Sequence, residues 1–171
     1  GSRLHRKIQK RMGTSYRSEV MLRHQVQEDM FDILVEGRAD GIITEPAGVT
    51  IDEIKCIYMD VSRLEEPDPV HLAQALCYGW FYSIQKELDS VGIQITYCNI
   101  ETEEICRFKE VRSFEELKSW FEGLIHEYVK WARYLYHHGI RRQECLKELP
   151  FPYPYREGQK ELAGNVYRSI A

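Results

Sequence analysis

The fold is decided by residues 37–57, GRADGIITEPAGVTIDEIKCI, where two apolar β-type runs flank a turn containing proline and glycine. Charged residues interrupt both runs at positions where a buried strand should stay apolar. Asp40 stands in the first run, and Asp-Glu-Ile-Lys occupies residues 52–55 of the second. We therefore expect two adjacent strands whose charged residues form a functional site and not only part of an apolar core.

The alternation of side chains along a strand divides the second run. Glu53 and Lys55 should project from one face, and Asp52 and Ile54 from the other. A tight turn between the strands can bring Asp40 beside Glu53. Two carboxylates and a backbone carbonyl are ligands for Mg²⁺ or Mn²⁺, and a lysine there can orient water or stabilise charge on a phosphate. The alternative is a surface Glu–Lys ion pair, which contributes little.

Outward from this stretch, the pattern predicts an α/β or α+β domain with a central mixed sheet. Turn signals and a Ser-x-x-Glu capping box set the boundaries. The expected elements are a helix at 3–12, strands at 16–27, 31–44 and 49–59, a helix at 70–88, strands at 91–100 and 105–111, and a helix at 114–137 with a shorter helix after it.

Composition excludes several classes of protein. The 171 residues are 43% hydrophobic and 29% charged, enough for one ordinary domain with a core. We expect no membrane partner, because every apolar run is broken by charge well before the ~20 residues that a span requires. Five cysteines, with no C-x-x-C pair, argue against a disulfide framework or zinc ribbon and favour a reducing, cytoplasmic location.

The charge is distributed unevenly. The net charge is −4, yet residues 1–24 hold seven lysines and arginines and a single acid, Glu19. Phosphate binding depends on the local field, so a basic leading segment is compatible with DNA. A solvated helix face is the alternative.

Three more residues complete a pattern. His5 lies in the basic first helix, and Gln74 and Tyr78 share one face of the second helix at i, i+4 spacing. Taken singly, Gln74 fits an ordinary surface position and Tyr78 a core aromatic. The order His, Asp, Glu-x-Lys, Gln-x-x-x-Tyr, from about residue 5 to 82, resembles the RecB-type branch of the PD-(D/E)XK nuclease superfamily.

This resemblance implies a restriction-endonuclease-like sheet and Mg²⁺- or Mn²⁺-dependent hydrolysis of DNA, often at single-stranded ends. The roles that it implies are metal ligation by His5, Asp40, Glu53 and the carbonyl of Ile54, catalysis by Asp40, Glu53 and Lys55, and DNA binding or bracing of the site by Gln74 and Tyr78. Tyr78, Trp80 and Tyr82 are also candidate stacking platforms for bases, although Trp80 fits the core better.

Some members of this branch hold an iron–sulfur cluster through one early cysteine and three late ones. Here no cysteine precedes Cys56, and only Cys145 lies near the end, so we expect no iron–sulfur cluster in this chain.

The tail differs from the rest. Residues 151–162, FPYPYREGQKEL, resemble the segment before the Walker A loop of XPD/DinG-type superfamily 2 helicases, where Arg156 and Gln159 match an Arg-x-x-Gln pattern whose glutamine contacts adenine. A Pro-rich linker is the alternative. The chain lacks a Walker A loop, so nucleotide binding would need the longer protein.

The sequence thus predicts a nuclease domain at 1–149 and the start of a covalently linked helicase domain at 150–171, in a DNA-repair helicase–nuclease. Two rivals remain: a catalytically inactive nuclease fold that binds DNA or acts as a scaffold, and an RNA-directed or structure-specific nuclease.

Overall fold

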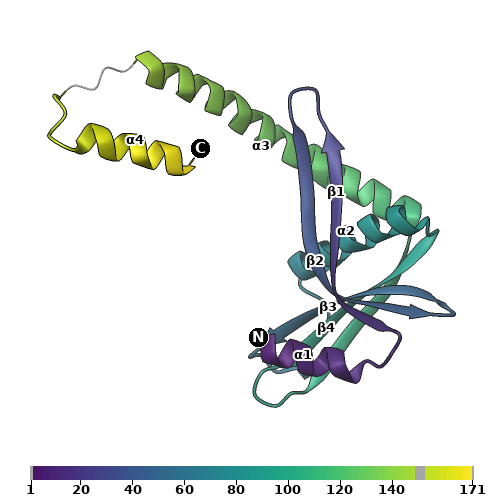
Figure 1. The fold of residues 1–171 in the computed structure, drawn as a ribbon. Helices are drawn as coiled ribbons and strands as arrows, with labels where there is room; N and C mark the ends of the chain where they lie inside the picture. The colour runs from purple at the N-terminus through teal and green to yellow at the C-terminus, as the bar shows by residue number, and fades with distance from the viewer. Residues whose placement is uncertain (1, 149–152, 171) are drawn as a thin grey trace. The chain divides into compact units, whose positions relative to one another are not determined.

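A five-stranded mixed sheet forms the centre of the computed structural model, which describes residues 2–148 and 153–170 (Figure 1). The strands lie side by side in chain order: β1 (Tyr16–Gln27), β2 (Asp32–Glu45), β3 (Gly48–Ile57), β4 (Ser90–Asn99) and β5 (Ile105–Ser113). Only β3 and β4 run parallel among these neighbours. The predicted α/β fold, a restriction-endonuclease-like mixed sheet flanked by helices, is confirmed.

The parallel pair depends on helix α2 (Pro69–Lys86), which carries the chain from β3 back to the start of β4. Asp68 begins the helix by accepting the backbone N–H of Val70 at 2.8 Å, and a proline follows at the first helical position. Glu87 ends it in the left-handed region at φ 53°.

The two faces of the sheet are covered differently. α2 packs on one face, where its Phe81 joins Ile51 and Ile93 of the strands in the main core. α1 (Ser2–Arg11) lies across the other face and buries Ile8 against Ile54 and Cys98 (Figure 1). Strand β3 therefore lies between two helices that come from distant parts of the chain.

β1 and β2 form a long ribbon that continues past the rest of the sheet (Figure 1). Only the last part of β2, from Gly41 to Glu45, pairs with β3. The earlier part, from Asp32 onward, pairs with β1 alone. The two strands β2 and β3 therefore separate at Asp40, the residue directly before Gly41.

Helix α3 (Phe114–Glu148) begins at the predicted capping box, where a carboxylate oxygen of Glu116 accepts the backbone N–H of Ser113 at 2.8 Å. It does not end near residue 137 but continues to Glu148, so the shorter helix expected directly after it is part of α3. Gly139 was the only break signal in this region, and one interior glycine costs a helix only about 1 kcal/mol.

The apolar residues that recur along one side of α3 are buried only near its start. Leu117 and Phe121 are buried, whereas Leu124, Trp131 and Leu135 are exposed. A helix of this length extends to ~50 Å, well beyond a ten-residue strand of ~33 Å, so the sheet cannot cover its whole face.

The chain divides into two compact units, Gly1–Ile125 and His126–Ala171. The second unit contains the remainder of α3 and helix α4 (Gln159–Ile170). The predicted domain boundary at 149/150, and the first two residues of the helicase-like motif, Phe151 and Pro152, lie outside the described residues.

No helix among the described residues is both long and apolar enough to cross a membrane.

Candidate active site

Asp40 lies where the β2–β3 ladder stops. The last residue pair of that ladder is Gly41 with Asp52. One step further, the Asp40 carboxylate Oδ2 accepts the backbone N–H of Ile54 at 2.8 Å. A side chain thus takes the place of a main-chain partner, which fixes the carboxylate between the two strands.

The alternation of side chains reverses at this point. Ala39 and Ile42 are three positions apart, yet both lie in the same core, which a regular strand would not allow. Glu19, opposite Asp40 on β1, has φ 58°, in the left-handed region. We attribute the position of Asp40 at the strand edge, rather than on a sheet face, to this reversal.

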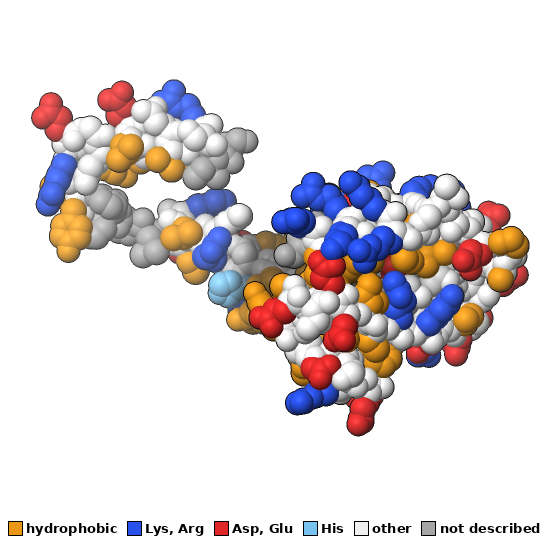
Figure 2. All heavy atoms as spheres, turned by 90° about the horizontal axis from the view of Figure 1, so that it is seen from below, with side chains coloured by type: hydrophobic (Ala, Val, Ile, Leu, Met, Phe, Trp, Pro, Cys, Tyr) orange, Lys and Arg blue, Asp and Glu red, His pale blue; other side chains and the backbone are white. Residues whose placement is uncertain are grey.

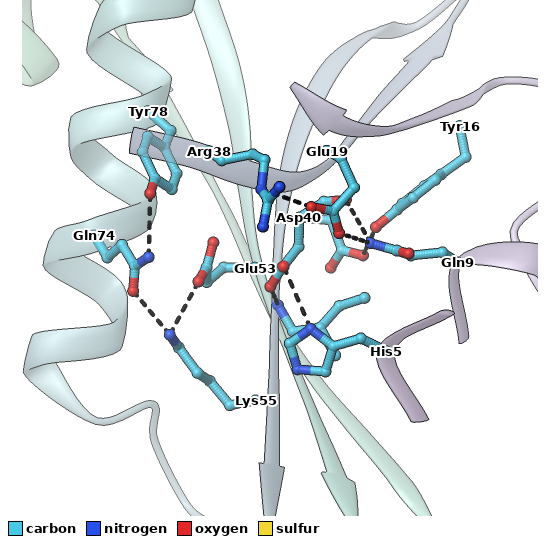
Figure 3. Close-up of polar contacts among 12 residues, drawn as sticks. His5, Gln9, Tyr16, Glu19, Arg38, Asp40, Glu53, Lys55, Gln74 and Tyr78 are labelled. Carbon is cyan, nitrogen blue, oxygen red and sulfur yellow. Dashed lines mark hydrogen bonds and ion pairs between the residues drawn. The ribbon is translucent and has the colours of Figure 1, made fainter. Parts of the chain in front are cut away.

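Glu53 and Lys55 project together toward α2, as predicted (Figure 3). Lys55 Nζ lies 2.9 Å from Glu53 Oε1 and donates to Gln74 Oε1 at 2.8 Å. Only 3% of Glu53 is exposed, and its second oxygen, Oε2, is buried without a hydrogen-bond partner. Burial, reinforced by the charge of Asp40, raises the pKa of Glu53 from its ordinary 4.5 to about 7, although Lys55 opposes the increase.

His5 reaches the site from α1. Its Nδ1 lies 3.3 Å from Asp40 Oδ1, and this contact is the main reason why the pKa of His5 is raised. Gln9, one turn further along α1, donates to the backbone oxygen of Asp40 at 3.0 Å. The helix therefore holds Asp40 from the opposite side to α2 (Figure 3).

Gln74 and Tyr78 form a chain that ends on Lys55. Gln74 Nε2 donates to the Tyr78 hydroxyl at 3.2 Å while its oxygen accepts from Lys55. Gly37 makes room for this ring, because a Cβ there would lie 2.5 Å from the Tyr78 hydroxyl. Gln74 thus holds Lys55 through a direct hydrogen bond, and the predicted role of Gln74 and Tyr78 in DNA binding or bracing stays a prediction.

The rings of Tyr78, Trp80 and Tyr82 are all buried. None of them presents an open face to a base, so the expectation that they act as stacking platforms is wrong. A one-sided apolar stripe could not have placed all three inward, because positions two apart lie on different sides of a helix, whereas here every residue from Tyr78 to Ser83 is buried.

Asp52 projects to the opposite face from Glu53, as expected, and is fully buried. Its carboxylate accepts hydrogen bonds from Thr96 Oγ1 at 2.6 Å, Gln94 Nε2 at 2.9 Å and the Tyr16 hydroxyl at 3.2 Å. Three donors satisfy this buried group, which indicates a structural role for Asp52.

The predicted ligands for a divalent cation are Asp40, Glu53 and the carbonyl of Ile54, and the chemistry of these groups can be compared with what such an ion needs. Lys55 contacts Glu53 Oε1, but the buried Oε2 of the same carboxylate has no hydrogen-bond partner and remains available as an acceptor. The carbonyl of a strand residue points to the same edge as its N–H, and the N–H of Ile54 points to Asp40. No three His, Cys, Asp or Glu side chains of the described residues form a ready-made metal cluster, so water would complete the coordination. Ligation by His5 stays a prediction.

Sequence reasoning missed Gln9, Glu19 and Arg38. Arg38 Nε pairs with Glu19 Oε2 at 2.7 Å, and Gln9 Nε2 donates to Glu19 Oε1 at 3.0 Å (Figure 3). Spacing could have found Gln9, which is four positions after His5 on α1. Strand alternation could not have found Arg38, because it reverses between Ala39 and Ile42. No pattern indicated that Glu19 would lie beside them.

Arg156 and Gln159 lie in the second unit. The side-chain oxygen of Gln159 accepts the backbone N–H of Arg156 at 2.8 Å, directly before α4. Their predicted role toward adenine in a longer protein stays a prediction.

No protein-family model matches the sequence, and no curated protein matches it significantly. Among solved structures, the fold is similar to that described as the crystal structure of SSO0001, with a TM-score of 0.50 and 21% sequence identity. The match covers 64% of this chain and 48% of that chain, so this chain spans about half of it. The similarity concerns the fold alone.

Proposed function

We propose that the first unit is a metal-dependent nuclease that hydrolyses phosphodiester bonds of DNA, acting on single-stranded ends with Mg²⁺ or Mn²⁺. The observation that carries the proposal is the meeting of Asp40, Glu53 and Lys55 at the point where β2 and β3 separate, with one Glu53 oxygen buried and unpartnered. A buried carboxylate with a raised pKa beside a second acid is typical of a functional site.

The residues of the site divide the chemistry between them. A bound divalent cation would lower the pKa of a water molecule and offset the charge of the phosphate. Asp40 is held for this by Ile54 and His5, and it cannot rotate freely. Lys55, fixed by Glu53 and Gln74, keeps an ammonium at the site that can stabilise the negative charge developing on the phosphate.

The charge of α1 supports a nucleic-acid substrate. Five of its ten residues are exposed lysines or arginines, and basic side chains gather on the face of the first unit seen from below (Figure 2). α1 also carries His5 into the site. A strand attracted by this helix would therefore be led to Asp40.

The experiment that tests the proposal is incubation of labelled single-stranded DNA with Mn²⁺. Lys55→Ala should lower the rate by about 100-fold or more, the usual effect of removing one group that stabilises transition-state charge. Lys86→Ala removes an exposed lysine at the end of α2 and is the matched control. Equal degradation by wild type and Lys55→Ala would exclude this function, and RNA in place of DNA distinguishes the substrate.

A non-catalytic DNA-binding module is the second candidate. It is favoured by the lack of a three-residue ligand cluster within the described ranges. Calorimetry with Mn²⁺ distinguishes the two: no uptake of metal together with retained DNA binding indicates the scaffold, whereas uptake that is lost in Glu53→Gln indicates the nuclease.

We further propose that the chain continues into a helicase domain in a cytoplasmic DNA-repair protein. The proposal rests on the Arg-x-x-Gln pattern of Arg156 and Gln159. These two residues contact each other where α4 begins. Since the chain has no Walker A loop, it should bind no ATP by itself, whereas the longer protein should.

A further inference from the structure

An exposed ion pair lies at the rim of the candidate active site. Arg38 Nε is 2.7 Å from Glu19 Oε2, and the two side chains are 63% and 41% exposed. Glu19 is also linked through Gln9 to the backbone oxygen of Asp40. The pair is thus part of the same set of contacts that positions Asp40 (Figure 3).

The backbone of Glu19 makes its side chain unusual. Its φ of 58° is a conformation that glycine adopts without strain and that a residue with a Cβ adopts at a cost. Glycine would satisfy the backbone at this position. What glutamate adds is a carboxylate, and that carboxylate contacts Arg38 and Gln9.

Arg38 is suited to another anion. It lies two residues before Asp40 on β2, and its partner Glu19 is connected through Gln9 to the backbone oxygen of Asp40. A guanidinium has five N–H donors in a planar fork that fits two phosphate oxygens at once. An exposed ion pair with a single carboxylate is weak, so a phosphate can displace it.

We propose that Arg38 binds a backbone phosphate of the DNA beside the Asp40–Glu53 pair, and that Glu19 occupies the guanidinium until the phosphate displaces it. Glu19 thereby acts as a built-in competitor that weakens DNA binding. This inference rests on the proposed function for the identity of the ligand, but it concerns binding and not cleavage.

The test is fluorescence anisotropy with a labelled single-stranded oligonucleotide in EDTA, which separates binding from any cleavage. Arg38→Gln should weaken binding about tenfold and reduce the slope of log K against log salt by about 0.7, the value for one phosphate contact on a single strand. Glu19→Gln should tighten binding about threefold or more. In the double variant, the effect of Glu19→Gln should disappear.

Asp60 and Arg63 provide the matched controls. They form another exposed acid–arginine pair, with Arg63 Nε 3.5 Å from Asp60 Oδ2 and side chains 79% and 48% exposed. Asp60→Asn and Arg63→Gln make the same charge changes and should shift affinity less than twofold. Glu19→Gly is a second variant that removes the carboxylate and keeps the left-handed backbone, and it should also tighten binding.

Three results would overturn the inference. These are no DNA binding by the wild type, equal affinities of Arg38→Gln and Arg63→Gln, or tighter binding on Glu19→Gln that persists in the double variant with Arg38→Gln. The proposed function fails separately, when wild type and Lys55→Ala degrade DNA equally. If the protein does not cleave DNA but the variants bind it as expected, the inference about Arg38 and Glu19 holds and the proposed nuclease function is excluded.

Discussion

The carboxylate of Asp40 is hydrogen-bonded to the backbone N–H of Ile54 at 2.8 Å, across the gap where β2 leaves β3. This contact gives one acid two tasks, because it completes the backbone bonding of β3 and also presents an anion to the site. The structural task needs only an acceptor, whereas the chemical task needs the charge.

Substitution at Asp40 should separate these tasks. Asp40→Asn keeps an acceptor for Ile54 and should unfold at nearly the wild-type urea concentration, yet lose activity by about 100-fold or more. Asp40→Ala leaves the N–H of Ile54 without its acceptor and should cost about 1–3 kcal/mol in the free energy of unfolding. Equal stability of the two variants would show that the hydrogen bond contributes nothing.

Glu53 should make the protein less stable as pH rises. Its pKa is about 7 in the folded state and 4.5 ordinarily, so the folded protein holds an extra proton between these values. The contribution of Glu53 to the free energy of unfolding should fall by up to about 3 kcal/mol from pH 4.5 to 7 and then level off. His5, whose pKa is raised above its ordinary 6.5, adds a further loss of stability that begins near pH 6.5 and continues as pH rises through its folded pKa.

Glu53→Gln isolates the effect, because it leaves His5 in place. Measured by urea unfolding in EDTA, the free energy of unfolding of the variant should increase relative to that of the wild type as pH rises. Mn²⁺ at pH 7.5 should raise the melting temperature of the wild type alone. Parallel pH profiles of the two proteins would contradict this assignment.

Gln74 should affect turnover more than DNA affinity. Gln74→Met removes the acceptor that fixes Lys55, and we expect kcat to fall by about tenfold or more with KM within about twofold. Tyr78→Phe removes only the hydrogen bond between Gln74 and the Tyr78 hydroxyl and should lower kcat by less. A rise in KM with unchanged kcat would instead assign Gln74 to DNA binding.

Gly41 should tolerate no side chain. A Cβ there would lie 1.9 Å from the ring of Tyr16, so Gly41→Ala must displace that ring from Asp52 and should cost about 1–3 kcal/mol. Gly123→Ala is the control: it lies in α3 with nothing within 4 Å and should stabilise by about 0.5–1 kcal/mol. Thermal unfolding gives both values, and the same sign for both would refute the packing argument.

Strand alternation and turn signals were enough to predict the sheet, and they placed Glu53 and Lys55 on one face with Asp52 on the other. These features are local, because each depends on neighbouring residues in one strand. The length of α3 was not predictable in this way, since the expected break at residue 137 relied on weak signals that a long helix overrides.

The reversal of side-chain alternation at Glu19 and Asp40 could not be predicted from the sequence. Alternation assumes regular backbone, and a left-handed glutamate gives no compositional sign of itself. The same limit hid the contact between Arg38 and Glu19, because it joins two strands at a position where their regular pairing is interrupted. Metal binding and the substrate stay predictions, since both depend on ligands that the chain does not carry.

The position of β3 between α1 and α2 has a consequence for how this protein can change in evolution. Loops such as residues 28–31 at the ribbon tip can lengthen or shorten without moving Glu53. A single codon inserted before Asp52, however, would exchange the two sides of the strand, turning the acid and lysine pair toward α1 and the apolar residue toward α2. Length variation among descendants of this gene should therefore accumulate at the tip and be excluded from the centre.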